Sequence, residues 1–205
     1  MSSSTETVGA RTSDRVAPHR ERILDAIVSL VAEQGYHETA VDDVVARARC
    51  SKSAFYACFA GKEHAFAALL EREGERLLSA VVEAVAAETE PRRRVAAGVR
   101  TAVRGCIADT ATARVLLIES VGVSATIEER RRALHARFAA MVLVQARTAA
   151  AREGSPLGGL DLETLAYAVV GAVNEAVVHL LETGGDAEAA LRTVEHLVAT
   201  ALLPR

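Results

Sequence analysis

Basic and hydroxyl-bearing side chains gather in one short stretch, ARARCSKSAFYACFAGKEHAF, at residues 46–66. Lys52 and Lys62 can each neutralise a phosphate, and the hydroxyls of Ser53 and Tyr56 can hydrogen-bond to phosphate oxygens or base edges. The methyl groups of two nearby alanines can contact the methyl group of thymine. These residue types together predict a surface that binds nucleic acid.

The overall charge of the chain does not favour nucleic acid. Its 205 residues include 24 Lys and Arg against 27 Asp and Glu, which gives a formal net charge of −3. A protein that binds phosphate mainly through bulk charge should be basic. Any nucleic-acid binding must therefore come from a local patch, held in place by the elements around it.

Three short helices are predicted around this patch. Apolar residues recur at helical spacing over 18–34 and again over 41–48, and Ser51 can cap a third helix. Phe55 and Phe59 are four residues apart, so they share one helix face, which we expect to enter the core. Two short helices joined by a tight turn and braced by a preceding helix form a helix-turn-helix, whose second helix can enter the major groove.

The rest of the chain is also predicted to be helical. Half of the residues are hydrophobic and only 3% are aromatic, which favours an all-α fold with a helix-turn-helix domain at 18–66 and a larger helical domain at 67–205. Residues 1–17 show no periodicity and are expected to form a flexible arm. Further helices are expected at 62–86, 91–108, 113–121, 126–152, 161–182 and 186–203.

The order and spacing of these residues resemble the DNA-binding domain of the TetR family of bacterial transcriptional regulators. The resemblance runs from about Arg20 to Phe66 and rests on Gly35-Tyr36, Thr39 to Val44, Ser51-Lys52, Phe55-Tyr56, Phe59 and Lys62-Glu63. It implies a homodimer that binds double-stranded DNA, pairs through its last two helices and binds a small effector. The predicted DNA contacts are Thr39, Arg49, Ser51, Lys52, Ser53, Ala54, Tyr56, Ala57 and Lys62.

Three positions depart from the family pattern. Ala40 stands where Thr or Ser usually caps the second helix and contacts phosphate, and Thr39 is expected to replace that contact in part. Arg49 stands where Gly is common, in a turn that favours a left-handed residue, and it adds a positive charge. Cys58 stands where His or Tyr is often found, which removes a phosphate contact.

The larger domain offers candidates for an effector pocket. Pockets are mostly apolar with a few placed polar groups, and the helical stripe of Phe138, Met141 and Gln145 has this composition. Plain core packing explains the same stripe equally well. The predicted pocket residues are Leu70, Cys106, Leu117, Phe138, Met141, Gln145, Tyr167 and Asn174.

The last two predicted helices carry apolar residues over a wide face. A surface helix needs only one apolar face, so this breadth predicts a second burial partner, such as another copy of the chain. The predicted dimer contacts are Leu165, Val169, Val173, Val177, Leu191, Val194 and Val198.

Other chemistries have less support in the sequence. Cys50, Cys58 and Cys106 form no CxxC pair, and their odd number favours a reducing compartment, so we expect a cytoplasmic protein outside the membrane. Glu175 and His179 share a helix face, but a third metal ligand is not evident. The sequence has no GxSxG, HExxH or phosphate-loop motif. No metal, cofactor or catalytic residue is therefore predicted, and the chain is not expected to be an enzyme.

The sequence as a whole predicts a ligand-responsive, homodimeric repressor that binds an inverted-repeat operator and a small hydrophobic effector. One alternative is a helical protein-interaction module that has lost specific DNA reading, which the residues at Ala40 and Cys58 suggest. The other is a small helical enzyme whose catalytic groups lie far apart in the sequence. The operator, the effector and the direction of regulation do not follow from the sequence.

Overall fold

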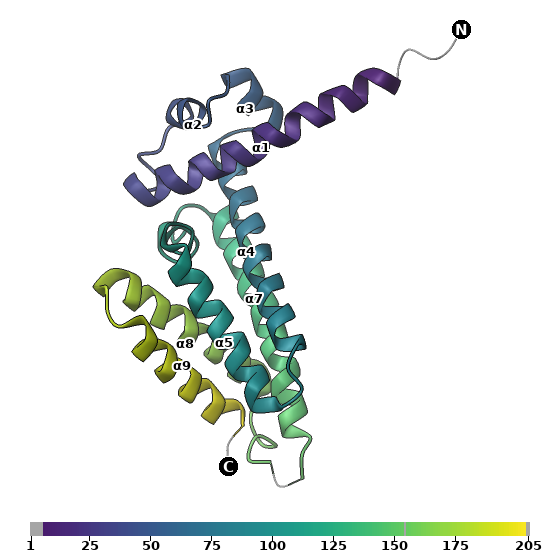
Figure 1. The fold of residues 1–205 in the computed structure, drawn as a ribbon, viewed down its shortest axis with the longest axis vertical. Helices are drawn as coiled ribbons and strands as arrows, with labels where there is room; N and C mark the ends of the chain where they lie inside the picture. The colour runs from purple at the N-terminus through teal and green to yellow at the C-terminus, as the bar shows by residue number, and fades with distance from the viewer. Residues whose placement is uncertain (1–5, 154, 204–205) are drawn as a thin grey trace.

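The computed structural model of the chain describes residues 6–153 and 155–203. Within these ranges every regular element is a helix, which confirms the all-α prediction (Figure 1). A small group of helices lies at one end of the long helix α4, and the remaining helices lie along the rest of it. The helices are α1 (Glu6–Gln34), α2 (Val41–Arg47), α3 (Lys52–Cys58), α4 (Lys62–Ala86), α5 (Pro91–Ala108), α6 (Thr110–Arg114), the π-helix η1 (Val115–Glu119), α7 (Ala125–Ala150), α8 (Leu162–Thr183) and α9 (Ala187–Leu202).

The small domain is built around a core that α1, α2, α3 and the start of α4 share. Phe55 and Phe59 of α3 are buried together with Phe66 of α4, and Ile23 and Leu24 of α1 complete this core. α2 and α3 both pack on α1. Because each of the two short helices is only two turns long, they depend on this shared core for stability.

The first helix ends where the sequence predicts and begins earlier. Gly35 has a φ of +85°, a left-handed conformation that glycine adopts without strain, and α1 ends one residue before it. Its start is at Glu6 rather than at Pro18, so Pro18 lies inside the helix, although proline removes a backbone donor there. Residues 1–5 of the expected arm lie outside the described residues.

The larger domain is a layer of long helices around α5. α4 packs on α5 and α7, α8 packs on α7, and α9 covers α5 and α8. Acidic residues open several of these helices: Glu90, Asp161 and Asp186 each accept hydrogen bonds from two backbone N–H groups in the first turn. These bonds lower the pKa values of Asp161 and Glu90, with a side-chain bond from Thr164 as the main cause at Asp161.

The segment between α5 and α7 differs from its prediction. The sequence predicts one helix over 113–121, but Asp109 caps a helix that begins at Thr110 and changes to the π-helix η1 at Val115. Such π-turns are uncommon and occur often at functional sites. α6 and η1 both pack on α1, so this segment joins the larger domain to the small one.

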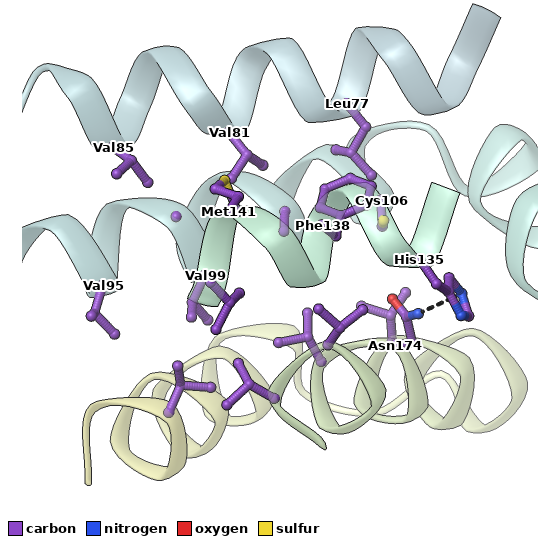
Figure 2. A pocket seen from close by; sticks show the side chains of 18 of the residues that line it. Leu77, Val81, Val85, Val95, Val99, Cys106, His135, Phe138, Met141 and Asn174 are labelled. Carbon is purple, nitrogen blue, oxygen red and sulfur yellow. Dashed lines mark hydrogen bonds between the residues drawn. The ribbon is translucent and has the colours of Figure 1, made fainter. Parts of the chain in front are cut away.

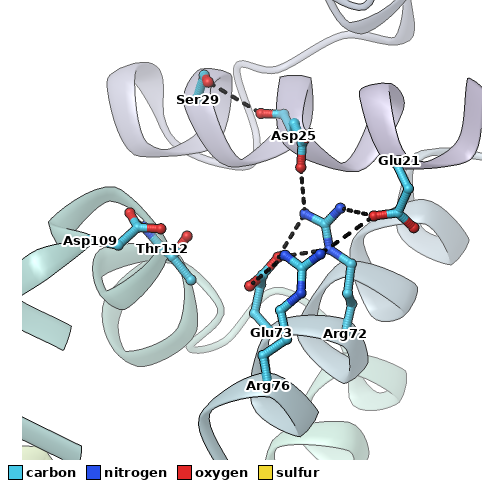
Figure 3. Close-up of polar contacts among 8 residues, drawn as sticks. All are labelled: Glu21, Asp25, Ser29, Arg72, Glu73, Arg76, Asp109 and Thr112. Carbon is cyan, nitrogen blue, oxygen red and sulfur yellow. Dashed lines mark hydrogen bonds and ion pairs between the residues drawn. The ribbon is translucent and has the colours of Figure 1, made fainter. Parts of the chain in front are cut away.

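A buried ionic cluster also joins α1 to α4 (Figure 3). Arg72 of α4 donates hydrogen bonds to Glu21 at 2.7 Å and Asp25 at 2.8 Å, both on α1, and to its neighbour Glu73 at 2.7 Å. The side chains of Arg72 and Glu73 are only 12% and 10% exposed, and Arg76 holds Glu73 at 3.0 Å from the other side. The cluster therefore fixes the angle between the small domain and α4.

We expect Arg72→Ala to lower the free energy of unfolding by about 2–3 kcal/mol, because the buried Glu73 carboxylate loses a charged donor and the more exposed Glu21 and Asp25 lose their link to α4. Arg76→Ala is the control: its side chain is 59% exposed, so its loss should cost under about 1 kcal/mol. Urea unfolding followed by circular dichroism measures both. Equal losses in the two variants would mean that the cluster does not hold the domains together.

Candidate nucleic-acid interface and effector cavity

Helix α3 presents one polar face to solvent and one aromatic face to the core. The hydroxyl of Ser51 accepts a hydrogen bond from the Ala54 N–H at 3.1 Å, which starts the helix as predicted. From there Phe55 is fully buried, while Lys52 and Tyr56 are exposed. Ser53 and Ala57 are exposed too, and Arg49 in the preceding turn is exposed with a φ of 50°. The predicted contact residues in and before α3 thus form one outward surface.

Lys52 is already paired in the free protein. Its Nζ lies 2.7 Å from a carboxylate oxygen of Asp42 in α2, and both side chains are well exposed. The hydrogen bond that Lys52 donates to the Asp42 carboxylate is the main cause that raises the pKa of Lys52, so the ammonium stays charged at neutral pH. A phosphate must compete with the Asp42 carboxylate for this ammonium.

Thr39 does not lie on this surface, contrary to the prediction. It is only 1% exposed, and its hydroxyl donates to the Gly35 carbonyl at 2.8 Å. Its side chain closes the turn between α1 and α2 and does not replace the missing cap at Ala40. Asp43 partly compensates, because its carboxylate accepts the Ala40 N–H at 3.0 Å.

Lys62 points inward rather than towards solvent. Its Nζ donates to the Tyr36 carbonyl at 2.9 Å and to the His37 carbonyl at 3.4 Å, and it lies 4.2 Å from the centre of the Tyr36 ring. Burial lowers the pKa of Lys62 from its usual value. Its main visible role is to hold the 36–37 turn against α4, so a phosphate contact would have to share an ammonium that is already hydrogen-bonded.

A cavity with about 1080 Å³ of empty space, part of it open to solvent, lies inside the larger domain (Figure 2). Its walls are apolar side chains from every long helix of that domain. Leu77, Val81 and Val85 of α4 form one wall, while Phe138 and Met141 of α7 form another. Apolar walls with a few placed polar groups are typical of small-molecule sites.

The structure brings most of the predicted pocket residues together around this cavity. Those that line it are Cys106, Leu117, Phe138, Met141, Gln145 and Asn174. Two predictions are corrected. Leu70 is buried in the core of the small domain, because α4 has not yet reached the larger domain at that point, and Tyr167 is 46% exposed on the outer side of α8.

Three polar residues of the cavity were missed by the sequence reasoning. Arg94, Arg131 and His135 all line it. Each lies on the same helix face as another residue that lines the cavity. Arg94 is four residues before Gly98, and His135 is three residues before Phe138. That spacing was a usable signal, but charged residues on helices usually face solvent.

One end of the cavity holds a polar pair. The Asn174 Nδ2 lies 3.1 Å from the His135 Nε2, so an imidazole with an unprotonated Nε2 accepts this hydrogen bond. Burial is the main cause that lowers the pKa of His135, and the nearby charge of Arg131 adds to it. His135 is therefore neutral at pH 7.

The three cysteines share no obvious reactive chemistry. Burial raises the pKa of each thiol, and that of Cys106 in the cavity wall rises to about 11. Few thiolates are present at neutral pH as a result. In the part of the chain that the structure describes, three or more His, Cys, Asp or Glu residues nowhere come close enough to hold a metal ion.

The family model for bacterial regulatory proteins of the tetR family matches residues 23–69. This stretch runs from the middle of α1 into α4 and includes the buried aromatic core and the exposed face of α3. Residues 23–69 therefore form a TetR-family DNA-binding domain.

Two solved regulator structures share the fold of most of this chain. The fatty acid degradation regulator FadR from Bacillus halodurans has a TM-score of 0.83 at 19% identity, over 92% of this chain and 98% of that one. FadR from Bacillus subtilis, solved in complex with stearoyl-CoA, has a TM-score of 0.76 at 18% identity, over 88% of this chain and 98% of that one. At these identities the likeness shows the fold.

A curated relative is similar in sequence over a shorter stretch. The HTH-type transcriptional activator FasR of Mycolicibacterium smegmatis is 33% identical over 94 residues, which are 44% of this chain and 42% of FasR. The match therefore covers less than half of that relative's length.

The predicted dimer contacts do not lie on a free surface of this chain. Val169 and Val177 of α8 and Leu191, Val194 and Val198 of α9 are buried in the core of one protomer. Leu165 and Val173 are partly buried against the same core, and Val173 also lines the cavity. The apolar stripe of each helix faces α5 and α7, so its burial needs no second copy.

A different face of α8 is exposed and low in charge. Tyr167, Ala168 and Gly171 lie on it, followed by Glu175 and His179. By length and composition α8 is the one described helix apolar enough to cross a membrane, with 17% of its most apolar window buried. A β-carbon built on Gly171 would meet no atom within 4 Å, so nothing in the protomer occupies this face.

We expect Thr39→Val to lower the free energy of unfolding by about 1 kcal/mol, because the Gly35 carbonyl loses its hydroxyl donor. DNA affinity should stay within about twofold of wild type, since the side chain is buried. Thermal unfolding and a DNA titration of the same preparation test both statements. A large loss of DNA affinity in a variant that is still stable would show that Thr39 contacts DNA after all.

Proposed function

We propose that this chain is a TetR-family DNA-binding transcriptional regulator that acts as a ligand-responsive homodimeric repressor. The exposed face of α3 carries the proposal, because it places Lys52, Ser53 and Tyr56 outward on a helix whose other face is fixed by Phe55 and Phe59. A recognition helix needs this division between a rigid inner face and a polar outer face. The proposal assigns the chain no catalytic step and places it in the cytoplasm.

The target is an inverted repeat in double-stranded DNA. Two α3 helices related by a two-fold axis meet half-sites about one helical turn of DNA apart, or a near multiple of it. Lys52 then exchanges Asp42 for a phosphate or a guanine edge, and Arg49 adds a second exposed cation beside it. Local charge of this kind is sufficient in a chain whose net charge is −3.

The effector is a molecule with a long apolar chain that fills the cavity. The aliphatic walls support this class, and so does the FadR relative from Bacillus subtilis, which was solved with stearoyl-CoA. η1 offers a route from cavity to DNA: Leu116 and Leu117 line the cavity, while Val115 and Leu116 pack in the core of the small domain. An effector that prefers one arrangement of η1 shifts the population of DNA-binding states by that difference in affinity.

The dimer forms through the outer faces of α8 and α9. Tyr167 and Gly171 on α8 and Leu197 on α9 are exposed there, and Leu197 is 52% exposed. A second copy would bury these apolar and small residues, while the protomer core leaves them free. Repression is the family expectation, and the FasR relative is named an activator, so the sign of regulation is a separate measurement.

Selection of bound sequences from a random duplex pool should enrich a palindrome. Lys52→Ala should weaken binding of the enriched site and lower the salt slope, plotted as log affinity against log salt, by about two, because each dimer loses two cations. Arg147→Ala, which removes an exposed charge at the far end of α7, should leave affinity and slope unchanged.

Two results would contradict the DNA-binding proposal. Equal binding of all sequences would favour the interaction-module alternative, and so would no binding in the presence of a cell extract that supplies a missing ligand. If Lys52→Ala and Arg147→Ala behaved alike on an enriched site, DNA would be read by another surface than α3.

Gly171→Arg should convert the dimer to a monomer without unfolding it. The new side chain has open space in the protomer, and replacing a helical glycine should raise stability by several tenths of a kcal/mol. Light scattering coupled to gel filtration measures the mass, and Ser79→Arg on the exposed side of α4 is the matched control. A Gly171→Arg protein that remains dimeric would place the interface elsewhere.

A further inference from the structure

Arg94 is a charged residue without a partner inside the cavity. Its side chain lines the cavity from the first turn of α5, and its Nε is fully buried without a hydrogen-bond partner. Among the described residues, no ion pair or hydrogen bond reaches any of its side-chain nitrogens. The residue as a whole is partly exposed, so its guanidinium keeps some contact with water, but the positive charge has no counter-charge and the buried Nε has no acceptor. This position therefore favours a bound anion.

The opposite end of the cavity is a less favourable place for an anion, because its basic groups already have partners. There Arg131 donates to the carboxylate of Glu128 at 3.1 Å, and His135 is already bonded to Asn174 at 3.1 Å. The Arg131 Nε is the one buried group at that end that lacks a partner. The positive charge of Arg131 is largely balanced by the Glu128 carboxylate, whereas the positive charge of Arg94 has no carboxylate paired with it among the described residues.

Arg94 also lies where the cavity meets the surface. A second hollow, with about 570 Å³ of empty space including open solvent, shares Arg94, Val95 and Gln145 with the cavity. Thr89 and Thr148 add hydroxyls to its walls. A polar head can therefore reach Arg94 from solvent while an apolar chain extends into the cavity.

We propose that the effector is an anionic amphiphile whose head is bound by Arg94, with Gln145 and Thr148 beside it, and whose alkyl chain points towards η1. This inference rests on the proposed function, because it takes the cavity as the effector site. Along α5 the distance from Arg94 to Cys106 is about 18 Å, at 1.5 Å per residue. Only a long chain anchored at Arg94 reaches Leu116 and Leu117, so the length of the chain decides whether η1 responds.

Calorimetric titration with palmitate, palmitoyl-CoA and hexadecanol tests the anchor. Arg94→Gln should weaken binding of at least one of the two anions by about tenfold or more and leave hexadecanol within about twofold. The anion that shows the loss identifies the head as a carboxylate or a CoA thioester. Arg93→Gln is the matched control, because Arg93 is exposed and does not line the cavity.

The variant itself is expected to fold. Arg94→Gln removes a charge that has no ion-pair partner and a buried Nε that has no acceptor, so its melting temperature without ligand should be close to or above that of wild type. Arg94→Lys, which keeps the charge, should retain more anion affinity than Arg94→Gln. A ligand-free melt below that of Arg93→Gln would show that Arg94 has a structural partner and would overturn the proposal.

The remaining outcomes separate the inference from the proposed function. If both anions and hexadecanol bind wild type and Arg94→Gln alike, the cavity binds apolar chains but Arg94 is not the anchor. If none of the three probes binds wild type, the proposed effector class fails as well.

Chain length is tested on the DNA complex. The eight-carbon and sixteen-carbon forms of the anion that shows the loss (octanoate and palmitate, or octanoyl-CoA and palmitoyl-CoA) should both bind in an Arg94-dependent manner. Only the sixteen-carbon form should change operator affinity, measured by fluorescence anisotropy. If the short and the long ligand changed operator affinity equally, η1 would not respond to the far end of the alkyl chain.

Discussion

One unbroken helix, α4, belongs to both hydrophobic cores, and the rest of the structure depends on this sharing. Phe66 and Leu69 are buried in the small domain, whereas Val81 and Val85 line the cavity of the larger one. At the crossing point the largely buried Arg72 ties α4 to α1 through ion pairs with Glu21 and Asp25, whose side chains are at least half exposed. Close-packed interiors change between discrete arrangements rather than deforming smoothly. A movement of the cavity wall at α4 or η1 therefore acts on the core that holds α3 in place.

The small domain could be predicted well because its signals are local. The cap at Ser51, the pair Phe55 and Phe59, and the stop at Gly35 each act within one helical turn or one loop, so spacing alone predicts them. Thr39 could not be placed in this way. Whether its hydroxyl faces a phosphate or the Gly35 carbonyl depends on how α1 and α2 meet, which is a tertiary contact.

The larger domain was predicted less well because an apolar stripe on a helix does not show which surface will cover it. The stripe on α8 indicates correctly that one face is buried, but Val169 and Val177 face the protomer core rather than a second copy. The same ambiguity hid Arg94, since sequence spacing places it near an apolar face without showing that a cavity opens there. A cavity is space that no side chain fills, so no local pattern in the sequence predicts it. Only the joint packing of α4, α5, α7 and α8 defines it.

The features that make the larger domain less stable without ligand are the same ones on which the proposed effector site depends. An apolar void loses dispersion contacts along its walls, and the partly exposed Arg94 has a buried Nε without an acceptor and a charge without an ion-pair partner among the described residues. A chain with an anionic head removes both costs at once, and its binding free energy adds to the stability of the state that holds it. η1 stands beside this void as a π-helix, a less regular form than the α-helix. Binding of such a ligand would therefore stabilise the segment at which the cavity and the small domain meet.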